Sequence, residues 1–238
     1  LNEAADSGFP STAPPCYNRT GKMSKLARVC DALEARYGRR EWAGGRPVLD
    51  ELIYTILSQN TTSANCSKAF ARLREHFPVW ESALAARTQE IADAIRPGGL
   101  ANRKAPRIKA VLEQAYAQQG SLDLQWIAKA SDAEAMDYLL GLDGVGRKTA
   151  ACVLMFGLGR PVLPVDTHVH RVTQRLGLIG RVSADRAHDL LAGMVPSERV
   201  YSFHVNTVAH GREVCRARSP RCDQCVIREE CAYLAGES

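Results

Sequence analysis

Residues 139–150 read Leu-Leu-Gly-Leu-Asp-Gly-Val-Gly-Arg-Lys-Thr-Ala, a glycine-rich turn between two stretches of helical periodicity. Gly144 and Gly146 permit the positive φ angles of a tight turn, so the stretch predicts two helices joined by a short reversal. The glycines also expose successive backbone N–H groups where the second helix begins, and such a nest binds a phosphate without reading a base. A plain helix–helix turn is the simpler interpretation, but Gly-Val-Gly followed at once by Arg-Lys-Thr-Ala is more specific than a lone glycine pair.

Lys148 lies in the first turn of the helix that follows the hairpin. A solvated side chain is the usual explanation for any lysine. A cationic amine at a helix N-terminus, however, meets an unfavourable dipole, and this field increases the fraction of neutral amine. Schiff-base chemistry requires a neutral amine, so the position is poor for stability and useful for catalysis.

Asp166 follows the apolar run Val-Leu-Pro-Val at residues 162–165 and precedes another predicted helix. Aspartate is a favoured N-cap residue, and a capping role alone explains its position. The two roles are compatible, because an aspartate that caps one helix can point toward a lysine at the start of another. Lys148 and Asp166 are therefore a candidate catalytic pair.

Helical periodicity dominates the chain from about residue 23 onward, and no alternating strand pairs are found. Apolar residues recur at helical spacing from Leu26 to Tyr37, Ser63 is expected to cap a helix that runs to residue 77, and Ser131 with Glu134 forms a predicted capping box. Further helices are expected at residues 47–58, 88–96, 102–118, 147–158, 167–178, 185–195 and 198–211. The predicted fold is all-α without internal repeats, preceded by a disordered tail at residues 1–22.

Four of the eight cysteines are crowded near the C-terminus as Cys215-x6-Cys222-x2-Cys225-x5-Cys231. Four thiolates this close together converge on one centre only if the loop wraps around it. Cysteine thiolates are the usual ligands of iron–sulfur clusters. Zinc also accepts four thiolates, although its common ribbons use two Cys-x2-Cys pairs and this chain has one. Buried free thiols are disfavoured by the interleaved arginines, so the spacing predicts a metal or a cluster.

Bulk properties describe an ordinary globular protein. The 238 residues carry a net charge of +5, with 45% hydrophobic and 24% charged residues, and this mild basic bias is compatible with nucleic acid. No apolar run is long enough to cross a membrane, and the N-terminal residues show no signal or transit sequence. A cytoplasmic, nucleoid-associated protein without a membrane partner is therefore expected.

Taken in order, the hairpin Leu-Asp-Gly-Val-Gly-Arg-Lys-Thr-Ala, the stretch Val-Asp-Thr-His at residues 165–168 and the four-cysteine spacing resemble endonuclease III. The hairpin itself resembles the helix-hairpin-helix motif. The resemblance covers residues 24–231 and implies two helical domains with the active-site cleft between them. These are a six-helix barrel with the hairpin at residues 47–160, and an iron–sulfur cluster domain at residues 161–238 joined by the N-terminal helix at residues 23–46.

The resemblance also implies roles for particular residues. Lys148 falls on the family's catalytic lysine, Asp166 falls on its catalytic aspartate, and the four C-terminal cysteines fall on the ligands of a [4Fe-4S] cluster. Leu100 aligns with the residue that the family inserts into the base stack. The remaining residues expected to contact DNA are Asn60, Arg103, Lys104, Gly144, Val145, Gly146, Arg147, Thr149, His168, Arg218 and Arg221.

The expected function is that of a bifunctional DNA glycosylase and AP lyase, a monomer that removes oxidised pyrimidines from damaged double-stranded DNA. A monofunctional mismatch glycosylase for adenine, thymine or uracil is a close alternative, but such relatives generally lack a lysine at position 148. A non-catalytic DNA-binding module is a second alternative, disfavoured because both Lys148 and Asp166 are present. Asn60 and Ser63 stand where the family often has Gln and Asp, so contact with the orphan base is the expected point of departure.

Overall fold

The protein is described here by a computed structural model that covers residues 23–236. Within these residues all regular structure is helical and no β-strand forms, which confirms the all-α prediction. No helix in this range is long and apolar enough to span a membrane. The predicted disordered tail, residues 1–22, lies outside the described residues.

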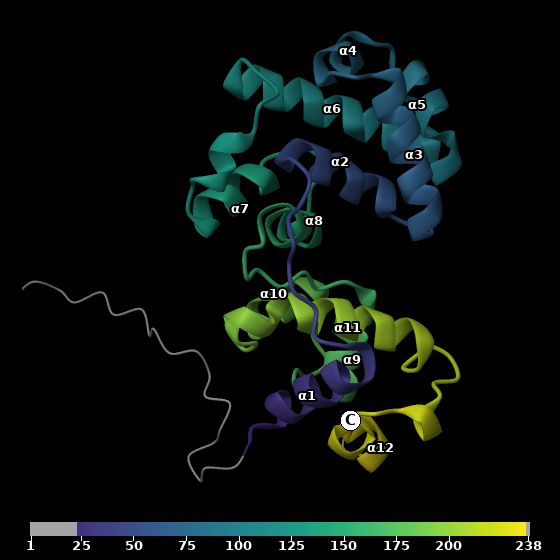
Figure 1. Cartoon of the computed structure of the whole chain (residues 1–238), viewed down its shortest axis with the longest axis vertical. Helices are drawn as coiled ribbons and strands as arrows, with labels where there is room; N and C mark the ends of the chain where they lie inside the picture. The colour runs from purple at the N-terminus through teal and green to yellow at the C-terminus, as the bar shows by residue number, and fades with distance from the viewer. Residues whose placement is uncertain (1–22, 237–238) are drawn as a thin grey trace, which may run out of the picture. The chain divides into compact units, whose positions relative to one another are not determined.

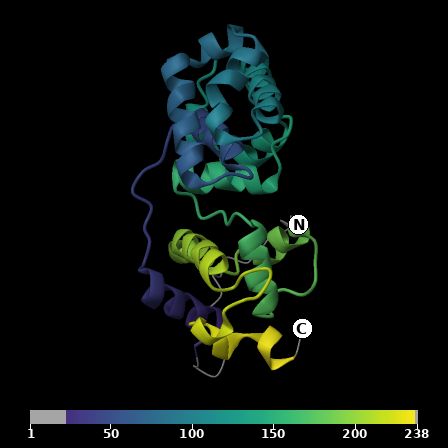
Figure 2. The same ribbon diagram turned by 90° about the vertical axis from the view of Figure 1, so that its right-hand side faces the viewer.

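The chain folds into two compact units, shown in Figures 1 and 2. Residues 41–166 form one, called here the hairpin unit. Of the described residues, 23–40 and 167–236 together form the other, called here the cysteine unit. The chain thus passes between units after Arg40 and after Asp166, whereas the sequence prediction placed these boundaries after residues 46 and 160.

The hairpin unit is a set of helices built around α2, the dark blue helix of Figure 1. Leu52, Ile53 and Ile56 of α2 are fully buried, and α2 packs against α3, α6 and α8. A helix that is apolar on nearly all faces can be stable only when other helices surround it. The helices of this unit are α2 (Val48–Ser58), α3 (Ser63–His76), α4 (Trp80–Ala85), α5 (Thr88–Ile95), α6 (Ala101–Gln119), α7 (Asp132–Leu140) and α8 (Arg147–Cys152), with the short turns η1 (Arg96–Gly98) and η2 (Gln125–Ala128).

Two helix boundaries in this unit differ from the sequence prediction. Thr62, not Ser63, caps α3, because its hydroxyl accepts a hydrogen bond from Asn65 N at 3.2 Å. The predicted helix at residues 147–158 is α-helical only as far as Cys152, and it continues as the π-helical turn η3 (Val153–Gly157). Single π turns within helices are frequent at functional sites.

The cysteine unit packs its N-terminal helix α1 (Lys25–Tyr37) and its helix α9 (Thr167–Arg175) against α11 (Val200–Glu213). Figure 2 shows the purple α1 beside the yellow-green part of the chain. Arg199 links the N-terminal helix α1 to the start of α11. Its Nη2 lies 2.7 Å from Asp31 and 2.8 Å from Glu34, both in α1. The remaining helices of the unit are α10 (Ala184–Leu191) and α12 (Ala232–Ala235), with the short turns η4 (Ser197–Arg199), η5 (Cys222–Gln224) and η6 (Arg228–Glu230).

The predicted capping box at Ser131 is confirmed, and it gives a test of the fold. Ser131 Oγ accepts from Glu134 N at 3.2 Å, and Glu134 Oε2 accepts from Ser131 N at 2.8 Å. Ser131→Ala should lower the free energy of unfolding by about 1 kcal/mol, because an N–H at the start of α7 loses its partner. Urea unfolding followed by circular dichroism measures the change. Ser131→Asp keeps a capping oxygen and should unfold like the parent; an equal loss in both variants would contradict the capping role.

Candidate functional site

The hairpin between α7 and α8 uses its two glycines for different purposes. Gly144 has a φ of +75°, which favours glycine, and a Cβ built there would lie 3.0 Å from Arg107 Cδ, so a larger residue would also displace the Arg107 side chain. Gly146 has an ordinary φ of −92°, a Cβ built there would meet no atom within 4 Å beyond its chain neighbours, and it is the N-cap of α8. The expectation of positive φ at both glycines is therefore correct at Gly144 and wrong at Gly146, where the absence of a side chain leaves the start of α8 open.

Val145 is not placed to contact a phosphate. Its side chain is buried in the core of the hairpin unit, and its N–H donates to Leu142 O at 3.0 Å. The predicted DNA contact at Val145 is therefore contradicted. Thr149 is also buried, so only its backbone N–H in the first turn of α8 could face a ligand. Arg147 is partly exposed and engaged within the protein.

Lys148 stands in the first turn of α8, and it shares its surroundings with three acidic groups. Its amine interacts with the thiol of Cys152, one helical turn further along α8. Burial, the largest effect, raises the pKa of the Cys152 thiol, the charge and hydrogen bond of Lys148 lower it, and the charges of Glu51 and Asp166 raise it again. The charges of Lys148 and Asp166, the predicted pair, thus both affect the pKa of the same buried thiol, that of Cys152.

Glu51 completes this group from the central helix α2. Its side chain is only 3% exposed. Oε2 lies 3.0 Å from Arg46 Nη1, and Oε1 accepts from Thr55 Oγ1 at 3.5 Å. Burial raises the pKa of the Glu51 carboxyl, while Arg46 and Lys148 oppose that rise. Glu51 and Cys152 were missed from the sequence; a glutamate inside the apolar stretch Val-Leu-Asp-Glu-Leu-Ile and a cysteine four residues after the lysine were the available signals.

Asn60 and Leu100 share an unusual backbone conformation. Each has a φ of +52°, in the left-handed region, and they are two of three non-glycine residues with positive φ in the described chain. Both side chains are exposed, Leu100 by 44%. Holding such residues in this region costs on the order of 1 kcal/mol or more each, and strain of this kind concentrates at functional sites. An exposed, strained leucine at a loop tip fits the predicted role as a wedge.

The basic residues of α6, all expected to hold phosphates, differ in exposure: Arg103 is exposed, Arg107 and Lys109 are half-buried, and Lys104 is buried. Lys104 is 4% exposed, and its Nζ donates to Leu57 O at 2.7 Å and to Gly98 O at 3.0 Å. The predicted phosphate contact at Lys104 is therefore wrong. A signal was present, because Lys104 falls on the apolar stripe that Ile108 and Val111 continue at positions i+4 and i+7.

The remaining predicted DNA contacts belong to the cysteine unit. His168 is half-buried, and its Nδ1 lies 3.1 Å from Arg171 Nη2. Arg218 and Arg221 are exposed, and neither side chain has a hydrogen bond or an ion pair among residues 23–236. Their guanidinium groups are thus available to an external anion.

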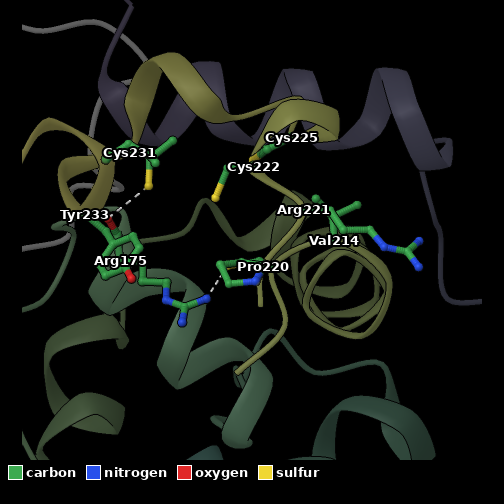
Figure 3. A pocket seen from close by; sticks show the side chains of 10 residues that line it. Arg175, Val214, Pro220, Arg221, Cys222, Cys225, Cys231 and Tyr233 are labelled. Carbon is green, nitrogen blue, oxygen red and sulfur yellow. Dashed lines mark hydrogen bonds between the residues drawn. The ribbon is translucent and has the colours of Figure 1, made fainter. Parts of the chain in front are cut away.

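Four cysteines line one pocket of the cysteine unit. Cys215, Cys222, Cys225 and Cys231 surround a space of about 280 Å³, part of which is open to solvent, together with Arg175 and Tyr233. Figure 3 shows the sulfur atoms of Cys222 and Cys231 directed into the same space, and the Arg221 guanidinium turned away from it. Burial raises the pKa of the Cys225 thiol, and the other three cysteines raise it further, which confirms that the four lie close together.

The shape of this pocket fits a cluster better than a single ion. A lone zinc ion draws its thiolates to about 2.3 Å from one point. Among residues 23–236 no three Cys, His, Asp or Glu side chains are gathered to hold one metal ion. A cubane has one thiolate on each of four irons, so its ligands stand further apart.

Two further polar side chains contact the sulfur atoms from the helices around the pocket. Arg175 Nη1 lies 3.3 Å from Cys215 Sγ, and His210 Nε2 lies 3.4 Å from Cys225 Sγ. Groups that donate to the ligands of a metal or cluster fix their orientation. The described residues therefore form a cradle for a thiolate-bound cluster rather than a set of inert thiols.

Family comparisons agree with this arrangement. Residues 53–196 match the model of the HhH-GPD superfamily base excision DNA repair protein, and residues 215–231 match the iron–sulfur binding domain of endonuclease III.

Individual relatives extend the agreement. A putative DNA glycosylase of Arabidopsis thaliana is 40% identical over 69% of this chain and 57% of its own length. Endonuclease III of Sulfolobus acidocaldarius is 36% identical over 79% of this chain and 83% of its own length. A solved structure of a trapped endonuclease III–DNA covalent intermediate superimposes with a TM-score of 0.73 at 28% identity, over 90% of this chain and 98% of that one.

The cysteine pocket predicts a defined metal content. The purified protein should be brown and contain about four irons per chain. Cys222→Ser should lose most of this iron, because one ligand is removed. Cys66→Ser is the matched control, since Cys66 is a buried thiol of the hairpin unit outside the pocket, and it should keep its iron. Iron and zinc analysis measures both; stoichiometric zinc without iron would contradict the cluster.

Proposed function

Because this chain belongs to the endonuclease III family of HhH-GPD base excision repair proteins, whose members are DNA glycosylases, we propose that it is a bifunctional glycosylase and AP lyase for oxidised pyrimidines in duplex DNA. The observation that carries the proposal is the placement of Lys148 in the first turn of α8, where the hairpin ends, next to the buried Cys152 thiol, whose pKa the charge of Asp166 raises. We also propose that it acts as a monomer, in the cytoplasm at the nucleoid.

The first step is extrusion of the damaged nucleotide. A base inside a duplex hides its glycosidic bond, so the nucleotide must leave the stack before it can react. The exposed Leu100 is proposed to occupy the opened step, as apolar wedges do. Asn60 is proposed to face the base that has lost its partner. Arg103, Arg218 and Arg221 then supply cations for phosphates, and the open start of α8 at Gly146 supplies N–H groups.

The chemical steps follow from one amine. Neutral Lys148 attacks C1′ of the sugar, the C1′–N bond breaks, and the base leaves with the bonding electron pair and takes up a proton. The Asp166 carboxylate stabilises positive charge on the sugar and accepts a proton from the amine. Opening of the ring gives an imine between Lys148 and C1′. The imine acidifies the proton on C2′, and its removal expels the 3′ phosphate, which breaks the strand.

The [4Fe-4S] cluster has a separate task in this scheme. Cys215, Cys222, Cys225 and Cys231 are proposed to hold it, and the cluster supplies cross-links between four points of one loop. The loop between Cys215 and Cys222 carries Arg218 and Arg221. The cysteines thereby give a fixed shape to a segment that presents two unpaired guanidinium groups.

The lysine mechanism has a direct test. Lys148→Gln should abolish borohydride trapping of the enzyme–DNA adduct, because the imine nitrogen is removed, while DNA binding stays largely intact. Lys129→Gln changes an exposed lysine of the same unit and should trap like the parent. An undiminished adduct from Lys148→Gln would identify a different nucleophile. Base release without any trappable adduct in the parent would indicate a monofunctional glycosylase.

Asn60 gives a second test, on recognition of the orphan base. Gln59 cannot replace it, since its Oε1 is held by Arg107 Nη1 at 2.9 Å. Glutamine at position 60 adds a methylene, worth about 0.8 kcal/mol of contact, and regains a hydrogen bond of about 1 kcal/mol. The gain is reduced because Asn tolerates the left-handed backbone better than Gln.

We therefore expect Asn60→Gln to speed excision from duplex DNA several-fold, up to on the order of tenfold. A single-stranded lesion has no orphan base, so its excision rate should stay the same. Single-turnover cleavage of one lesion in both contexts measures the difference. Equal changes in both contexts, or a loss in the duplex alone, would show that Asn60 does not fill the gap.

A further inference from the structure

Lys104 is a buried ammonium that connects the two loops proposed to enter the DNA. One of its carbonyl acceptors, Leu57 O, lies at the C-terminal end of α2, and the other, Gly98 O, lies at the end of η1. The last carbonyls of a helix lack partners within the helix and carry partial negative charge. Lys104 satisfies one such carbonyl from each helix with a single charged group.

The residues that follow these two carbonyls are the strained ones. Asn60 comes three residues after Leu57, and Leu100 comes two residues after Gly98. Because both carbonyl oxygens lie within 3.0 Å of the same Lys104 nitrogen, the distance between the starting points of the two loops is fixed. Figure 1 shows α6, which carries Lys104, crossing the hairpin unit next to α2.

Burying the Lys104 ammonium costs more free energy than burying an apolar side chain of the same size, so packing alone does not explain it. No carboxylate pairs with Lys104 in the described part of the chain, and burial lowers the pKa of its amine. A methionine would fill the same space without the cost of burying a charge. What an apolar residue would not supply is a pair of directed hydrogen bonds to two different loops.

A neighbouring contact shows that α6 organises more than one loop. Arg107, one turn after Lys104, holds the Gln59 side chain at 2.9 Å. Its aliphatic part also lies beneath Gly144 of the hairpin. The loop that carries Asn60 is thus fixed at its backbone by Lys104 and at its side chain by Arg107.

We propose that Lys104 is a positioning residue that sets the separation of Asn60 and Leu100, so that both side chains enter the base stack at the same step. This inference rests on the proposed function, in which those two residues stabilise the extruded nucleotide. Lys104 touches neither DNA nor the reacting atoms. It acts by making the two insertions cooperative, and its effect is therefore confined to duplex substrates.

A matched control exists on the same helix. Lys109 also donates from a half-buried Nζ to two backbone carbonyls, those of Leu84 and of Ala86 at 2.9 Å. It ties the connection between α4 and α5 to α6, and that connection carries none of the proposed DNA contacts. Lys104→Met and Lys109→Met therefore remove the same kind of interaction from the same helix, but only one of them frees the inserted residues.

The experiment measures single-turnover excision of one lesion in duplex and in single-stranded DNA, with 2-aminopurine opposite the lesion to report unstacking by fluorescence. Lys104→Met should slow excision from the duplex by about tenfold or more and reduce the fluorescence rise, because misplaced groups lose their fit. Excision from the single strand should change by less than about twofold, as should both rates of Lys109→Met. Circular dichroism establishes that each variant is folded.

A double-variant cycle separates positioning from a general structural effect. In an Asn60→Ala, Leu100→Ala background, Lys104→Met should add less than about twofold, since it has nothing left to position. An equal loss in both backgrounds, or an equal loss on the single strand, would overturn the inference. If Asn60→Ala, Leu100→Ala itself excises duplex lesions at the parental rate, the proposed function of those residues fails instead.

A folded substitute keeps the test valid if Lys104→Met does not fold. Lys104→Arg retains the charge and the donors but widens the spacing of the two carbonyls, and the same duplex-specific loss is expected. A parental duplex rate and a parental fluorescence rise in Lys104→Arg would contradict the inference.

Discussion

Among the residues of the hairpin unit that adopt positive φ angles are Asn60, Leu100 and Gly144, and side chains of helix α6 contact the loop that carries each of these three. Lys104 bonds to backbone carbonyls close to the first two, and Arg107 fills the space under the third. Strained backbone persists only where surrounding contacts over-determine it. The inward-facing cations of α6 supply contacts of this kind to the loops that carry Asn60 and Leu100.

Lys148 likewise has an energetically costly group near it, the buried carboxyl group of Glu51. Glu51 places a carboxylate inside the most apolar helix of the unit, where Arg46 and Thr55 compensate it only in part. A buried carboxylate costs stability unless it is paired, and its raised pKa records that cost. The electrostatic field around Lys148 is thus built from groups that a purely structural helix pair would not contain.

Local rules predicted much of this molecule. The hairpin, the capping box at Ser131 and the cysteine spacing are each contained in a short stretch, so their residues alone determine the geometry. The roles of Arg103 and Lys104 are separated only by helical phase: Lys104 falls on the apolar stripe that Ile108 and Val111 continue, and Arg103 does not, a difference that basic character alone does not show. Glu51 was missed for a different reason, since its closeness to Lys148 depends on how α2 packs against α8. Cys152 lies one turn after Lys148 on the same helix, so its closeness was visible in the spacing.

The segment of the cysteine unit that carries the four cysteines has little apolar packing of its own. Within residues 215–236 the only buried side chain is that of Ile227, and the helical turns there are three or four residues long. Burying one isoleucine contributes about 2 kcal/mol. Ordering the backbone costs about 1 kcal/mol or more for each residue. Apolar packing alone therefore does not hold this segment, and the four thiols, with Arg175 donating to Cys215 and His210 Nε2 lying 3.4 Å from Cys225 Sγ, would be the groups through which a bound cluster supplies further free energy.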